Sequence, residues 1–186
     1  MKKIAFLAAA ACAAIASPAM AQSATGTVQV TGSVAAKCTI TSPAPAAITL
    51  NELALADGTV NNTFSNVTGG LTRNFTVKCT SGSPTVAVSS TQLNNTTDST
   101  TGGGYTGQVQ YTSTVVADKS TTGTVTTSYT TLAALPAASS VSVGVPLKNA
   151  ADNVRVTVSN GTTTNTGDLL KSGSYTSTIT VVVSPT

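Results

Sequence analysis

The most restrictive feature of this sequence is a two-residue alternation of apolar and polar side chains that recurs along the chain. Successive side chains of a β-strand point to opposite faces, so this period is typical of strands with one buried face. Turn residues, mainly Gly, Asn, Asp, Ser and Pro, separate the alternating segments. The expected strands are residues 27–34, 71–79, 85–89, 108–111, 141–145, 153–159 and 175–183. The pattern predicts half-buried antiparallel strands and an all-β sandwich.

The composition favours the same fold class. Thr makes up about one fifth of the residues, far above ordinary usage, and Thr and Val are β-branched residues that favour strands. A disordered Thr/Ser-rich stalk is the alternative, but the regular alternation of apolar residues argues against it. The Ala-rich segment 133–138 is a candidate for a turn of helix, and Pro136 interrupts it.

The N-terminus has the layout of a secretory signal peptide. Lys2 and Lys3 precede an apolar stretch at residues 4–15, and Ala19-Met20-Ala21 is typical of a cleavage site. The alternative is a membrane anchor, but the apolar stretch is shorter than the ~20 residues that span a bilayer. We therefore expect residues 1–21 to be removed, and the mature chain to start near Gln22 outside the cytoplasm with no membrane insertion.

Cysteine usage agrees with export. Cys12 lies in the expected signal peptide, which leaves Cys38 and Cys79 in the mature chain. Two cysteines in an exported protein predict one disulfide. Closing a loop of about 40 residues would stabilise the fold by about 4 kcal/mol in the chain-entropy model. A metal site is not expected, because it needs more ligands and the sequence contains no His.

Charge and motifs exclude several classes of function. The charges are few and scattered singly, so neither nucleic acid nor an anionic membrane is an expected partner. Without His, neither a Ser-His-Asp nor a Cys-His catalytic arrangement can form. The Gly102–Gly104 run has no following Lys-Ser/Thr and is not a phosphate loop. A glycosidase with paired carboxylates stays open as an alternative, but we expect no enzyme and no cofactor.

The two ends of the mature chain raise a question about strand pairing. Residues 22–34 lie outside the disulfide loop, and the alternation places Val28, Val30, Gly32 and Val34 on one face. At the other end the sequence stops soon after segment 175–183, where a seven-stranded immunoglobulin-type sandwich would add another edge strand. A groove with unpaired backbone and a spare strand are complementary. Residues 25–34 could be donated to a neighbour or fold back as the first strand of their own domain, and the pattern leaves both open.

Four motifs together carry a family resemblance. They are the alternating N-terminal strand, Lys37-Cys38-Thr39-Ile40 with a second Cys after Phe75-Thr76-Val77-Lys78, Val109-Gln110-Tyr111, and the ending from Gly173-Ser174-Tyr175 to Val181-Val182-Val183. With them the chain resembles the spore coat U domain family, which includes pilins of the archaic chaperone–usher type. It departs from that family at residues 50–53, where an aliphatic-x-Phe-Gly element is usual, and at Ser177, where the family has Asp.

The resemblance implies a fold and a mechanism. Family members are incomplete immunoglobulin-like sandwiches, each completed by donor-strand exchange with a neighbour. By position, residues 22–34 would be the donor segment, with Val28, Val30 and Val34 as plugs and Gly32 allowing close approach, and residues 35–186 would be the pilin domain. The acceptor groove would be lined by the last strand, namely Tyr175, Ile179, Val181 and Val183.

The resemblance also implies partners and a location. These are identical or homologous pilin subunits, a periplasmic chaperone and an outer-membrane usher, with the finished fibre at the cell surface. The expected function is a structural subunit of an extracellular pilus, and the sequence leaves open whether the fibre serves adhesion, biofilm formation or another purpose. The alternative is a monomeric secreted β-sandwich that binds a ligand, as a lectin-like module or an adhesin does.

Overall fold

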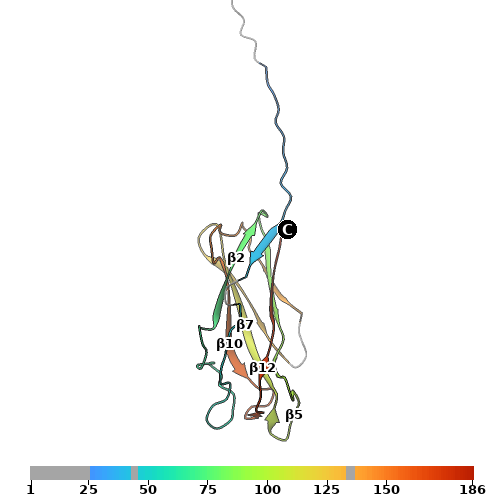
Figure 1. Cartoon of the computed structure of the whole chain (residues 1–186). Helices are drawn as coiled ribbons and strands as arrows, with labels where there is room; N and C mark the ends of the chain where they lie inside the picture. The colour runs from blue at the N-terminus through green and yellow to red at the C-terminus, as the bar shows by residue number, and fades with distance from the viewer. Residues whose placement is uncertain (1–25, 43–45, 133–136) are drawn as a thin grey trace, which may run out of the picture. The chain divides into compact units, whose positions relative to one another are not determined.

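The computed structural model describes residues 26–42, 46–132 and 137–186, and in these ranges the chain is all-β, as predicted (Figure 1). No helix in them is long and apolar enough to cross a membrane. The expected signal peptide and most of the Ala-rich segment lie outside the described residues. The strands are β1 (Cys38–Thr41), β2 (Thr72–Cys79), β3 (Thr85–Ser90), β4 (Leu93–Asn95), β5 (Thr101–Gly102), β6 (Tyr105–Thr106), β7 (Gln108–Asp118), β8 (Thr124–Thr130), β9 (Ser139–Ser142), β10 (Val154–Thr162), β11 (Leu169–Leu170), β12 (Tyr175–Thr176) and β13 (Ile179–Ser184).

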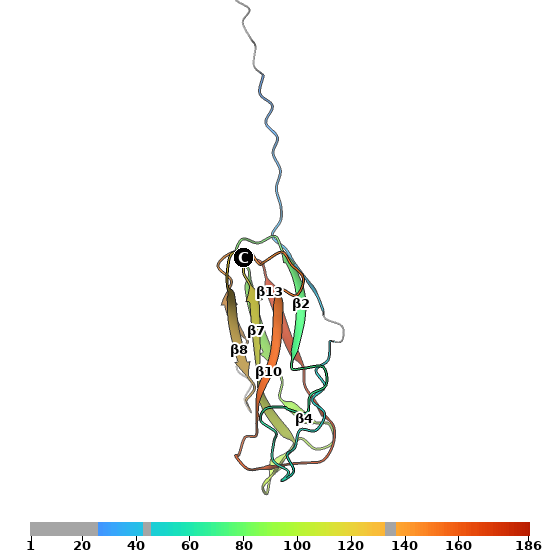
Figure 2. The same cartoon turned by 90° about the vertical axis from the view of Figure 1, so that its left-hand side faces the viewer.

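Two antiparallel sheets form the layers of a β-sandwich, which Figures 1 and 2 show from two sides. The first sheet has the order β1-β2-β10-β7-β4-β12, and β8 also pairs with β7. The second sheet has the order β13-β3-β9. A small third sheet, β11-β6-β5, contains the one parallel pair found among the described strands, between β11 and β6. The compact unit runs from Val34 to Thr186.

The core lies between the layers and follows the predicted alternation. Strand β3 buries Val86 and Val88, and β10 buries every second residue from Val154 to Val158. The buried residues form two clusters. The first joins β3 of the second sheet to β2, β7, β8 and β10 of the first. The second gathers around Tyr111 and consists of Leu53, Phe64, Leu93, Val109, Tyr111 and Val158.

Two neighbouring segments of the chain cross between the two sheets side by side. They are β3 with β4, and β12 with β13. Tyr175 pairs with Asn95 in β4, but Ile179 pairs with Ser90 in β3, so the register shifts by one residue between the two pairs. Two residues, Gln92 and Leu93, therefore stand opposite Ser177. This is a β-bulge, which bends a strand and changes the phase of its alternation. Both Gln92 and Leu93 are buried, as expected at such a change of phase.

The structure corrects three of the expected strands. Residues 27–34 are not a strand, because none of the described residues supplies a hydrogen-bonded partner for them. Segment 175–183 is two strands, β12 and β13, because the bulge interrupts it at Ser177 and Thr178. The strand expected at 141–145 is β9, which ends at Ser142, because Gly144 has a φ of 75° that strand geometry does not allow.

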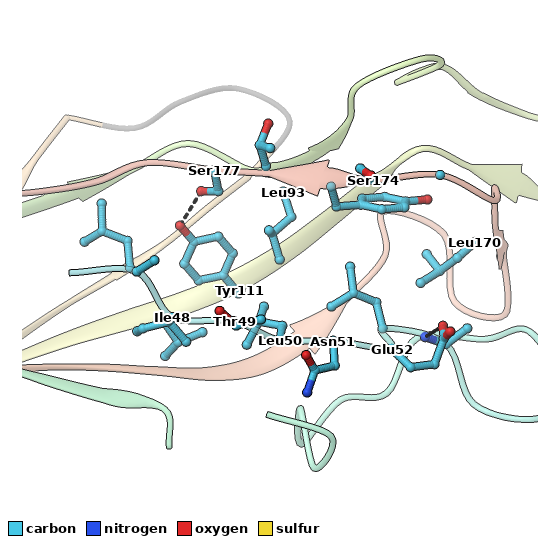
Figure 3. A pocket seen from close by; sticks show the side chains of 18 of the residues that line it. Ile48, Thr49, Leu50, Asn51, Glu52, Leu93, Tyr111, Leu170, Ser174 and Ser177 are labelled. Atoms are coloured by element: carbon cyan, nitrogen blue, oxygen red, sulfur yellow. Dashed lines mark hydrogen bonds between the residues drawn. The ribbon is translucent and has the colours of Figure 1, made fainter. Parts of the chain in front are cut away.

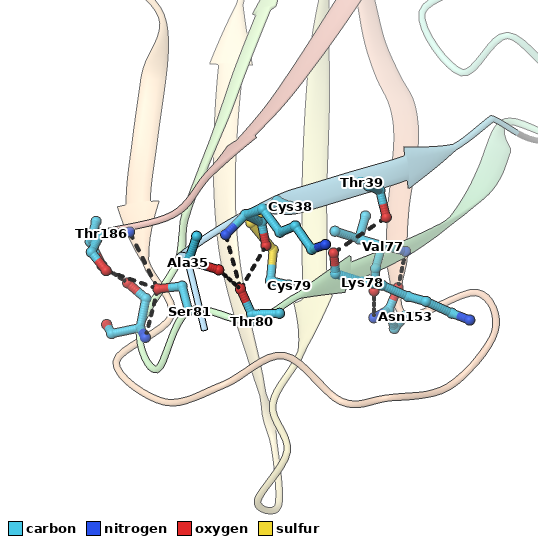
Figure 4. The surroundings of a disulfide bond; sticks show 12 residues. Ala35, Cys38, Thr39, Val77, Lys78, Cys79, Thr80, Ser81, Asn153 and Thr186 are labelled. Carbon is cyan, nitrogen blue, oxygen red and sulfur yellow. Dashed lines mark hydrogen bonds between the residues drawn. A yellow bond between two sulfur atoms is a disulfide. The ribbon is translucent and has the colours of Figure 1, made fainter. Parts of the chain in front are cut away.

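The predicted disulfide between Cys38 and Cys79 is present (Figure 4). The two cysteines are direct partners in the β1–β2 ladder. Next to them, the Thr80 hydroxyl accepts from the main-chain N–H of Lys37 at 2.9 Å and donates to the carbonyl of Ala35 at 2.8 Å. The chain therefore enters the compact unit at a point tied both covalently and by hydrogen bonds to the end of β2.

Candidate binding groove

The two long sides of the sandwich differ. On one side β8 of the first sheet and β9 of the second lie close together, and the Thr127 and Ser139 hydroxyls hydrogen bond at 2.8 Å. On the other side β13 pairs with β3 alone and β12 with β4 alone, so the outer edges of both have no partner strand within the described ranges. We refer to this second side as the open side.

A pocket of about 890 Å³ lies on the open side (Figure 3). We call it the groove. One side is Ala46–Ala54, which we call the wall segment, and the other is residues 170–177 together with Ile179. The floor belongs mostly to the second core cluster and is apolar, consisting of Phe75, Leu93, Tyr111, Val156 and Val158, and the buried Arg73 lines the groove beside it. Figure 3 shows Ile48 and Leu50 of the wall segment on the side facing Tyr111.

The free edge of β13 offers main-chain hydrogen bonds next to this floor. The Thr91 N–H donates to the Thr178 carbonyl at 3.0 Å, so Thr178 directs its main-chain groups toward the β3 side. Because these directions alternate along an antiparallel strand, the N–H and C=O groups of Ile179, Val181 and Val183 point away from β3. The side chains of the same three residues pack against the core. The edge thus combines unpaired backbone with apolar side chains.

A chain of hydroxyl groups crosses the floor at the bulge. The Tyr111 hydroxyl donates to Ser177 Oγ at 2.6 Å, and Ser177 Oγ donates to the Thr91 carbonyl at 2.6 Å. Burial raises the pKa of Tyr111, so its hydroxyl keeps its proton at any ordinary pH. Ser177, which stands where the resembled family has Asp, therefore joins the floor to the strand that changes sheets.

The structure brings together only part of the predicted acceptor set. Tyr175 and Ile179 line the groove, whereas Val181 and Val183 lie beyond the groove lining and pack against the first core cluster. Sequence reasoning missed the whole wall segment, and also Leu93, Tyr111, Leu170 and Arg73. The wall segment follows two prolines and alternates only over Ile48-Thr49-Leu50-Asn51, which is shorter than most of the segments that were predicted as strands around the core. Arg73 does stand in phase with Leu71, Phe75 and Val77, and a lone Arg at such a position could have been noticed.

The predicted donor residues are exposed. Val28 and Val30 are 90% and 91% exposed, Val34 is 81% exposed, and Gly32 has no heavy atom within 4 Å of a Cβ placed on it. Residues 26–37 contain no strand.

The groove has the features of a peptide-binding site and lacks those of a metal centre. Across the part of the chain that the structure describes, no group of three or more His, Cys, Asp or Glu residues could hold a metal ion. An apolar floor beside an unpaired strand edge suits an extended peptide, whose backbone would pair with the edge while alternate side chains fill the floor. No protein-family model matches the chain, and no curated protein matches it at a significant level.

Proposed function

We propose that this protein is a structural subunit of an extracellular fibre of the pilus type. Each subunit inserts its own N-terminal segment, residues 25–34, into the groove of the next subunit. The sequence resemblance to archaic chaperone–usher pilins supports this proposal. The proposed role is mechanical, and no residue is given a part in catalysis.

One observation carries the proposal: the apolar floor of the groove meets the free edge of β13 at Ile179. The complementary part is the donor segment, whose Val28, Val30 and Val34 are exposed and share one face by their spacing. A strand of about ten residues spans roughly 33 Å, and β12 with β13 covers a similar run from Tyr175 to Ser184. Burying each Val would contribute about 1.5–3 kcal/mol, and the added ladder would slow dissociation.

The proposed contact explains why the product would be a fibre. A donor segment and an acceptor groove are different surfaces, so the contact between two subunits is heterologous. Such a contact repeats from subunit to subunit and gives an open filament when it does not close into a ring. The proposal includes an export route through the periplasm, with a chaperone that covers the groove before assembly and an usher in the outer membrane.

The experiment compares two single substitutions in the donor segment. Val30→Asp places a charge on the face that would enter the apolar floor, and Gln29→Asp places the same charge on the opposite face as the matched control. We expect the Gln29→Asp protein to run as a ladder of polymers on unheated SDS gels and the Val30→Asp protein to run as a monomer. Sheared cell-surface material should show filaments by electron microscopy only for the control.

Three results would contradict the proposal. Filaments of normal abundance from Val30→Asp would show that the donor face is not inserted. A wild-type protein that stays monomeric at every concentration would favour the alternative, a secreted β-sandwich that binds a ligand as a monomer. Equal loss of polymers in both variants would show that the effect belongs to charge alone and not to the inserted face.

A further inference from the structure

Arg73 is a buried cation on the core-facing side of β2. It is 9% exposed and lines the groove. The two ion pairs found among the described residues, Asp118–Arg155 and Asp98–Lys171, do not include it. A buried charge is strongly unfavourable unless its hydrogen bonds are satisfied, so the partners of Arg73 show what it does.

All recorded partners of the Arg73 guanidinium are main-chain carbonyl oxygens. Nε and Nη2 donate to the carbonyl of Ala47 at 2.8 and 2.5 Å. Nη1 donates to the carbonyls of Gly69 at 3.1 Å, Gly70 at 3.0 Å and Thr72 at 2.8 Å. The rigid planar fork of an Arg can reach several acceptors at fixed angles, which the single ammonium of a Lys cannot do. One side chain therefore joins the wall segment, the turn before β2 and β2 itself.

The other attachments of this part of the wall segment lead to the same turn. The Thr68 N–H donates to the Thr49 carbonyl at 3.0 Å, and these two residues are the partners of an isolated bridge. The Asn51 side chain donates to the Asn66 carbonyl at 2.6 Å and to the Thr68 hydroxyl at 2.7 Å. Arg73 binds both segments, so it adds to the bonds that hold the wall segment against the turn at residues 66–70, which leads directly into β2.

We infer that Arg73 is the positioning residue of the groove, which holds the wall segment at the distance from β12 and β13 that an inserted strand requires. This inference rests on the proposed function, since it treats the groove as the acceptor of a strand. Apparent affinity falls in proportion to the population of the binding-competent state. A wall segment that is free to move would therefore weaken strand capture even if the floor and the free edge stayed intact.

The test uses the mature chain with Val30→Asp as a background, so that the groove stays available, and a fluorescent synthetic peptide of residues 25–34 as the probe. We expect Arg73→Gln to weaken peptide binding, measured by anisotropy, by at least about tenfold. Arg73→Lys should also weaken it. Hydrogen exchange should accelerate at wall-segment amides in both variants, while amides of β7 and β10 keep their protection.

A rescue separates positioning from a general loss of stability. Thr49 and Thr68 are direct bridge partners, a geometry that a disulfide can span, so Thr49→Cys with Thr68→Cys would tie the wall segment to the turn without Arg73. The oxidised tether should restore peptide binding of Arg73→Gln to within about threefold of the background. Peptide mapping checks that Cys38 still pairs with Cys79. If Arg73→Gln does not fold, Arg73→Lys with and without the tether answers the same question.

The outcomes distinguish this inference from the proposed function. If the background protein does not bind the peptide, the proposed function is contradicted. Wall-segment exchange that is unchanged in the Arg73 variants overturns the inference whether or not the peptide binds. Binding lost with Arg73→Gln and not restored by the tether overturns it too, because Arg73 would then act by some means other than holding the wall segment.

Discussion

Among single residues, the buried amide of Asn153 hydrogen bonds to main chain through both of its polar atoms. It is 1% exposed, its Oδ1 accepts from the Val77 N–H at 2.8 Å, and its Nδ2 donates to the carbonyls of Val77 at 2.8 Å and Lys148 at 2.7 Å. The amide thus takes the place of a neighbouring strand where β10 begins beside β2. Its polar groups are fully used, as buried polar groups must be.

Asn153→Ala should therefore destabilise the protein markedly. The substitution leaves the N–H and C=O of Val77 buried without partners, and we expect a loss of about 3 kcal/mol in the free energy of unfolding. Urea denaturation measures it, with Asn74→Ala on the exposed face of β2 as the matched control, which should change little. An Asn153→Ala protein as stable as the control would mean that water replaces the amide without loss.

A second effect at the scale of single residues is a loss of folding stability at acidic pH. The Arg155 guanidinium hydrogen bonds to both carboxylate oxygens of Asp118, at 3.1 and 2.8 Å, and lowers the pKa of that carboxyl. A lowered pKa in the folded state adds stability above the pKa of the unfolded state, and this stability is lost as the pH falls through the folded value. Both groups are partly exposed, so the contribution should be about 0.2–1 kcal/mol.

Asp118→Asn provides the measurement. We expect the wild type to exceed the variant by this amount near neutral pH, and the difference to shrink steadily below about pH 4 as Asp118 takes up its proton. Asp98, whose pKa is also lowered by its hydrogen bond with Lys171, is present in both proteins and cancels in the comparison. A difference that stays constant from neutral pH to about pH 2 would contradict this account of the pair.

At the scale of elements, β13 is the strand whose two edges should behave differently. The main-chain groups of Thr180 and Val182 point toward β3, whereas those of Ile179, Val181 and Val183 point to the open side. In the monomer we expect the amides of the latter three to exchange quickly with solvent and the intervening two slowly.

Polymerisation should slow amide exchange at the open edge of β13 and leave exchange at the edge paired with β3 unchanged. If a neighbour's strand pairs with the open edge, amide exchange at Ile179, Val181 and Val183 should slow by more than about a hundredfold. Thr180 and Val182 serve as internal controls, because their groups are already directed at β3. Hydrogen-exchange mass spectrometry of monomer and polymer, with fragments that resolve single residues, would show it. If the amides of Ile179, Val181 and Val183 exchanged equally fast in monomer and polymer, strand addition at β13 would be excluded.

For the whole molecule, the question is whether residues 26–33 contribute to the compact unit that begins at Val34. A mature chain truncated to start at Val34 should unfold with the same free energy as the Val30→Asp monomer, within about 0.5 kcal/mol, and should form no polymers. A loss of more than about 2 kcal/mol would show that the segment folds back as the first strand of its own domain. Chemical denaturation and unheated SDS gels measure the two properties.

The fold was predictable where one face of a strand is apolar and the other polar. For this reason the alternation predicted the buried faces of β3 and β10 correctly. These faces carry Val86, Val88, Val154, Val156 and Val158. Strand β8 was missed because Thr127 occupies the centre of its buried face, so the apolar alternation is broken. The two-residue period also cannot detect a bulge, which is a property of two paired segments. For this reason segment 175–183 looked like one strand.

The groove was less predictable than the fold, for a physical reason. Its free edge follows from the last strand, which the sequence indicates well. Its wall segment is held by hydrogen bonds to main-chain carbonyls, such as that of Ala47. Every residue has such a carbonyl, so these bonds do not change the order of apolar and polar residues in the sequence. The bonds of Arg73 become evident only when the turn at residues 66–70 and the wall segment are seen side by side.

The place of the disulfide has a mechanical consequence. A pull applied to the chain ahead of Val34 reaches Cys38 after four residues, and the covalent bond passes the load directly to Cys79 at the end of β2. Strand β1, which pairs only with β2 among the described strands, is thereby spared from being peeled away one hydrogen bond at a time. Tension instead acts on β2, whose neighbour β10 lies inside the sheet. Reduction of this one bond should make the protein yield at a much lower force.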